Sequence, residues 1–122
     1  MFSLGNALWM LAYPLSWYTS FPAAIPHTGP FNSHFVRDIG VVYVCVAIGF
    51  ACCAVHPART YAIHLGLTAF FTGHALLHLF DILSGNLPHS HWLIDAPMVF
   101  LPAIIMIILA LPAVRKPLAA SS

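Results

Sequence analysis

Charge is scarce in this sequence. Of its 122 residues only 6% are charged, four Lys or Arg and three Asp, whereas 61% are hydrophobic. A water-soluble domain carries about 25% charged residues because its surface faces water. The composition therefore excludes an ordinary soluble domain and indicates that lipid surrounds much of the chain.

Basic runs and spaced cysteine pairs are also missing. Nucleic-acid binding requires clustered Lys and Arg to neutralise phosphates, so this function is excluded. The three cysteines, Cys45, Cys52 and Cys53, fall in one apolar segment without a CxxC spacing, which argues against a disulfide framework or a thiolate zinc site.

Long apolar stretches dominate what is present. A helix needs about 20 apolar residues to cross the hydrocarbon core, and Pro- and Gly-rich breaks separate four stretches of this length. Pro14 predicts a kink in the first, which lacks the basic start of a signal peptide. We predict an all-α polytopic membrane protein, a four-transmembrane-helix bundle forming a single domain over residues 1–122. The expected spans are residues 3–20, 34–55, 60–83 and 92–111.

The few cations predict an orientation. With four spans, the link between the second and third lies on the same side as both termini. That side holds Arg59, Arg115 and Lys116, and the other holds Arg37 beside Asp38. Because cytoplasmic loops carry an excess of cations, we expect both termini in the cytoplasm of a bacterial inner membrane.

Histidine is the unusual residue here: the chain contains eight. The predicted threading brings six of them, and all three carboxylates, toward the extracytoplasmic side. The six are His27, His34, His74, His78, His89 and His91. Any polar chemistry of this chain is therefore expected to use imidazoles.

The third span carries a polar stripe. At 100° per residue, His74, His78 and Asp81 lie within roughly 60° of one another on the helix. Ionisable groups at this depth cost about 2.5–3.5 kcal/mol each, so they normally face the bundle interior and partner one another. We expect these three side chains to share a site.

Imidazole and carboxylate together are ligands for zinc, copper(II) or iron, and two histidines four residues apart on a helix can reach one ion. The predicted ligands of a divalent transition metal are His74, His78, Asp81 and His34. The supporting residues are Arg37, Asp38, His89, His91 and Asp95. The same groups would serve redox or proton chemistry. Haem is disfavoured, because the second span offers an axial histidine only at its end.

A structural interpretation stands beside the metal site. The cluster can simply join helices by hydrogen bonds in a non-catalytic accessory subunit of a larger membrane complex. No nucleophile–base pair, HExxH or cofactor motif is present, which argues against an enzyme acting alone. The expected partners are the lipid bilayer and other membrane subunits or a second copy of the chain.

The stretch NSHFVRDIG at residues 32–40, followed by Tyr43, resembles the start of the second helix in DoxX-like small four-helix membrane proteins. The resemblance covers about ten residues and the overall hydropathy of the chain. It implies a four-helix membrane fold and draws attention to Arg37 and Asp38. Quinol oxidation is associated with particular members of that group only.

Overall fold

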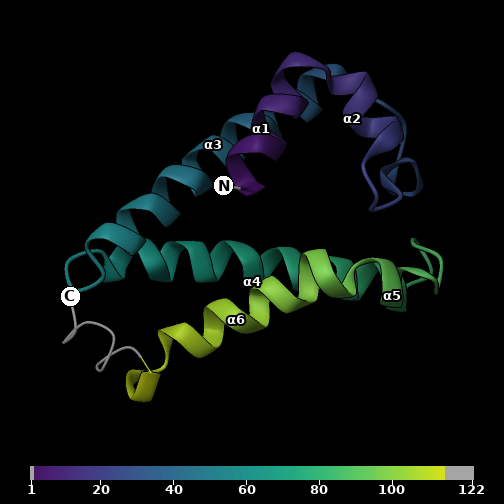
Figure 1. Cartoon of the computed structure of the whole chain (residues 1–122). Helices are drawn as coiled ribbons and strands as arrows, with labels where there is room; N and C mark the ends of the chain where they lie inside the picture. The colour runs from purple at the N-terminus through teal and green to yellow at the C-terminus, as the bar shows by residue number, and fades with distance from the viewer. Residues whose placement is uncertain (1, 115–122) are drawn as a thin grey trace. The chain divides into compact units, whose positions relative to one another are not determined.

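The computed structural model describes residues 2–114, and these are helical with no strand among them (Figure 1). The helices are α1 Phe2–Ala12, α2 Pro14–Ser20, the 3-10 helix η1 Ile25–Thr28, α3 Ser33–Val55, α4 Tyr61–Leu83, α5 His91–Ile94, the π-helix η2 Ala96–Phe100 and α6 Leu101–Ala110. The prediction of an all-helical chain is confirmed. The chain forms two compact units, Met1–Ile48 and Gly49–Ser122. The boundary between them falls within α3.

In the first unit, the predicted first span is two helices. Tyr13 leaves the helical conformation, with φ −134° and ψ 63°, and α2 starts at Pro14, whose ring cannot continue a helix. The Trp17 indole N–H donates to the Asn6 Oδ1 over 2.7 Å. In one straight helix these residues would lie about 16 Å apart along the axis, so the chain bends sharply at Tyr13. The kink expected from Pro14 is present.

Two contacts hold α1 against the start of α3. Arg37 Nε donates to the Leu11 carbonyl over 3.3 Å, which supplies a partner to a backbone group next to the break in the helix. Gly40 lies so close to α1 that an added Cβ would be 3.0 Å from Leu11 Cγ and 3.3 Å from the Ala7 carbonyl oxygen. A glycine at this position therefore permits the close packing of the two helices.

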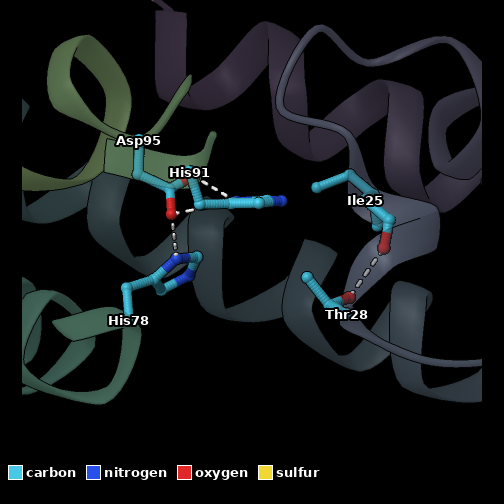
Figure 2. Close-up of polar contacts among 5 residues, drawn as sticks. All are labelled: Ile25, Thr28, His78, His91 and Asp95. Atoms are coloured by element: carbon cyan, nitrogen blue, oxygen red, sulfur yellow. Dashed lines mark hydrogen bonds and ion pairs between the residues drawn. The ribbon is translucent and has the colours of Figure 1, made fainter. Parts of the chain in front are cut away.

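The connector of the first unit packs beside an aromatic core. Met10, Trp17 and Val36 are buried there. The hydroxyl of Thr28 donates to the Ile25 carbonyl over 2.8 Å and closes η1, a contact drawn in Figure 2. The core thus joins α2 and η1 to α1 and α3.

In the second unit, the end of α3 packs against α4. Gly49 allows the close approach, because an added Cβ would meet Ile63 and Leu67 side-chain atoms at 3.3 Å. The rings of Phe50 and Phe71 follow, with centroids 5.8 Å apart. The last two turns of α3 thus pack against the first half of α4 within the second unit.

The α4 and α6 helices lie side by side in the second unit (Figure 1). His64 Nε2 and Thr68 Oγ1 both donate to the Met106 carbonyl oxygen, over 3.3 Å and 3.4 Å. A carbonyl oxygen only accepts, so Nε2 of His64 carries the hydrogen. These bonds fix one end of the helix pair.

The fourth predicted span corresponds to α5, η2 and α6 in succession. The carbonyl of Asp95 accepts from the N–H groups of both Val99 and Phe100, over 2.8 Å and 3.2 Å. The second bond reaches back five residues and defines a π turn beside Pro97, which has no N–H to donate. The helical path therefore widens immediately after Asp95.

Two helices, α3 and α4, are long and apolar enough to cross a membrane by length and composition. Only 17% and 11% of their most apolar stretches are buried within the structure, whereas the core helix of a soluble protein is mostly buried. The four-span bundle and single membrane domain stay predictions. Arg115 and Lys116, on which the predicted orientation partly depends, lie outside the described residues.

Candidate metal centre

Two histidines and an aspartate meet in the second unit. His78, His91 and Asp95 each offer a ligand atom, and these atoms all lie within 4.8 Å of one another. His78 Nδ1 is 2.8 Å from Asp95 Oδ2, and His91 Nδ1 is 3.1 Å from the same oxygen. Figure 2 shows the Asp95 carboxylate contacted by both imidazoles.

Local structure brings these residues together from two elements. His78 belongs to the penultimate turn of α4, and Ser84 and Gly85 then end that helix, Gly85 with a positive φ of 77°. The returning chain starts α5 at His91. Because Asp95 follows four residues later, the two side chains lie on the same face of the helical turn.

The π turn coincides with the carboxylate. Asp95 provides the carbonyl that accepts two N–H groups, and its side chain makes the imidazole contacts. π turns are rare and occur frequently at functional sites, where they redirect side chains. This irregularity is independent of the ligand distances and marks the same residue.

Burial makes the cluster electrostatically demanding. The side chains of His91 and Asp95 are 0% exposed and that of His78 is 16% exposed. An ionised carboxylate removed from water needs hydrogen bonds or an opposite charge. The two Nδ1 atoms supply the hydrogen bonds when each carries a hydrogen, and a cation bound between the three groups would supply the charge.

His74 lies beside the cluster without belonging to it. Its ring centroid is 4.6 Å from that of His78, with the planes 69° apart, and it stacks parallel to Phe70 at 6.2 Å. The predicted proximity of His74 and His78 is therefore observed. The three-residue group nevertheless excludes His74.

Asp81 occupies a different position from the one expected of a ligand. Its Oδ1 accepts a hydrogen bond from the Asn86 amide over 3.0 Å, at the end of α4. The carboxylate beside His78 is that of Asp95. His89 is exposed and is not part of the group.

The remaining predicted residues belong to the first unit. His34 Nε2 lies 3.3 Å from Asp38 Oδ2, one turn along α3, and both side chains are largely exposed. Arg37 contacts the Leu11 carbonyl, as described above. None of these three belongs to the His78, His91 and Asp95 group.

The sequence contained a signal for the observed group. His91 and Asp95 have the same four-residue spacing as His74 and His78, and both were expected only as supporting residues. Their position after the turn that follows Leu83 brings them back to His78. The observed group therefore joins one residue of the predicted polar stripe to two residues of the following connector.

No family model, curated protein or solved structure matches the chain. The resemblance to DoxX-like proteins therefore stays a prediction.

Proposed function

We propose that this chain is a small membrane protein that binds a divalent transition metal ion through His78, His91 and Asp95. The observation that carries the proposal is the convergence of two imidazole nitrogens and a carboxylate oxygen within 4.8 Å in a buried location. This ligand set suits zinc, iron or copper(II).

The spacing of the ligand atoms suits such an ion. Bonds of about 2.0–2.1 Å at tetrahedral angles place neighbouring ligand atoms about 3.3 Å apart. The two Nδ1 atoms lie 2.8 Å and 3.1 Å from Asp95 Oδ2. Separations a few tenths of an ångström larger would accommodate the metal, which is within the reach of small side-chain rotations.

Binding would exchange hydrogens for an ion. An imidazole that donates to Asp95 in the hydrogen-bonded arrangement carries hydrogen on Nδ1. A bound metal would replace the Nδ1 hydrogens and move each neutral imidazole to its Nε2–H form. The ion would thereby neutralise the buried carboxylate, which stabilises the folded state.

Membrane insertion is the second part of the proposal. Each of the two long helices has 23 residues and therefore extends about 34 Å, slightly more than the hydrocarbon thickness of about 30 Å. Large apolar side chains are exposed along both, including Ile48 at 59% and Leu76 at 58%. Lipid tails would cover these side chains without a further protein surface.

A structural tie is the competing function. The carboxylate of Asp95 already accepts a hydrogen bond from each imidazole, so the cluster can join α4 to α5 without a metal. This favours an accessory subunit, in which the cluster holds the helices in a geometry that a neighbouring subunit recognises.

Metal content distinguishes the two functions. We would purify the full chain in mild detergent and measure bound zinc, iron and copper by mass spectrometry, for wild type and for His78→Gln, His91→Gln and Asp95→Asn. Wild type should carry stoichiometric metal, and each variant should lose most of it. His89→Gln is the matched control, because it removes an exposed imidazole of the same connector.

Circular dichroism would show whether each variant keeps its helices. Wild-type protein that stays metal-free after incubation with each of the three ions would refute metal binding and leave the structural tie.

A further inference from the structure

The described part of the chain provides three ligands to this site, and we infer that a small monoanion is the fourth ligand of the bound metal. The inference rests on the proposed metal site and specifies what that site binds. It depends on the number of side chains that converge, on their charge and on the position of His74.

The number of converging side chains is one short of the usual four metal ligands. Within the described residues, the group of His, Cys, Asp and Glu side chains that could hold an ion contains three members. Residues 115–122 contain none of these residue types. Zinc and related ions take at least four ligands, and sites with three protein ligands complete the set with an exchangeable molecule.

The net charge of the metal and its three ligands also favours an anion. A divalent ion with one carboxylate and two neutral imidazoles retains a net charge of about +1. Such a charge is costly where His91 and Asp95 are both 0% exposed, because little water solvates it. A bound monoanion would bring the net charge to zero, whereas a neutral fourth ligand would not.

The placement of His74 also bears on the fourth ligand. The ring centroid of His74 is 4.6 Å from that of His78, yet His74 lies outside the three-residue group and stacks on Phe70 with the planes 2° apart. His74 therefore borders the site without adding a fourth ligand atom to the group. His78 is also the most exposed of the three ligands, at 16%.

Cobalt(II) provides the test, because its visible absorption reports both coordination number and ligand exchange. The full chain in detergent would be loaded with cobalt(II) in chloride-free buffer and titrated with sodium azide. We expect strong visible bands of a four-coordinate ion that shift saturably with azide. The shift should be retained in His74→Ala, because His74 is not a ligand.

Two results would overturn the inference. Cobalt bound stoichiometrically but unresponsive to azide would mean that a fourth protein side chain completes the coordination. An azide response found only in His74→Ala would identify His74 as that side chain. Failure of cobalt to bind at all, or binding unchanged in His91→Gln, would instead refute the proposed metal site, so the two failures are distinguishable.

Discussion

Removal of the Asp95 carboxylate should have a large effect even without metal. In the metal-free protein this buried group accepts hydrogen bonds from His78 and His91. Each hydrogen bond to a charged group contributes about 1.5–3 kcal/mol, and its loss leaves a buried donor without a partner. We therefore expect Asp95→Ala to lower the free energy of unfolding by about 3–5 kcal/mol.

Asp81→Ala is the matched control. Asp81 makes one side-chain hydrogen bond, to Asn86 at the more exposed end of α4. Water replaces such a bond readily, so we expect a loss below about 1 kcal/mol. Each substitution removes one aspartate side chain. The difference between their effects on the free energy of unfolding therefore reports the burial and the hydrogen bonds of Asp95.

The assay is unfolding of chelator-treated protein in mixed micelles, followed by far-ultraviolet circular dichroism as the fraction of denaturing detergent rises. Zinc at 100 times its dissociation constant should then stabilise wild type by about 2.7 kcal/mol and leave Asp95→Ala unchanged. Equal stability of Asp95→Ala and Asp81→Ala in the metal-free state would refute the reasoning. It would mean that the imidazole contacts contribute nothing to folding.

Three further predictions about the packing use the same unfolding assay. Thr72→Val should stabilise the protein by about 1 kcal/mol, because the buried Thr72 hydroxyl has no hydrogen-bond partner among the described residues. Thr68→Val, which removes bonds to two carbonyls, should destabilise it by a similar amount. Effects of the same sign would contradict the difference in hydrogen bonding between the two hydroxyls. Gly40→Leu should cost about 1–3 kcal/mol, because its side chain would overlap α1, and an unchanged midpoint would disprove the close packing. Trp17→Phe should lower the free energy of unfolding by about 1 kcal/mol, because it leaves the buried Asn6 without its indole donor. An Asn6→Leu variant as stable as wild type would contradict this prediction.

The long helices were the most predictable part of the fold. The expected stretches 34–55 and 60–83 correspond to α3 at Ser33–Val55 and α4 at Tyr61–Leu83. These stretches are uninterrupted by proline, and breakers lie at their ends, so local propensity and hydropathy agree. Composition does not show which chain surfaces meet, and the assembly of four spans therefore stays a prediction.

The first expected span shows the limit of hydropathy. Residues 3–20 are mostly apolar and carry no charge, but Pro14 divides them into α1 and α2. Mean hydropathy over a stretch of residues indicates how long an apolar segment is, but not whether its helix bends. The hydrogen bond between Asn6 and Trp17 across this bend joins residues eleven positions apart and has no periodic signature.

Only the part of the candidate site that lies on α4 could be predicted from the sequence. Helical spacing placed His74 near His78 correctly, but it favoured Asp81 as the carboxylate because both lie on one segment. The observed carboxylate, Asp95, is positioned by the turn after α4 and by the π turn at η2. Neither the direction of a turn nor a change of helical register follows from residue periodicity.

The bonds from His64 and Thr68 to the Met106 carbonyl have a consequence for the opposite end of the helix pair. His64 and Thr68 lie fourteen and ten residues before His78 along α4, separations of about 21 Å and 15 Å, while Asp95 precedes Met106 on the returning segment. Because α4 contacts the returning segment at two distant points, it can neither shift by a residue nor rotate about its axis unless one of the contacts breaks. Weakening the bonds to the Met106 carbonyl should therefore change the metal affinity at His78 and His91, although no side chain there has changed.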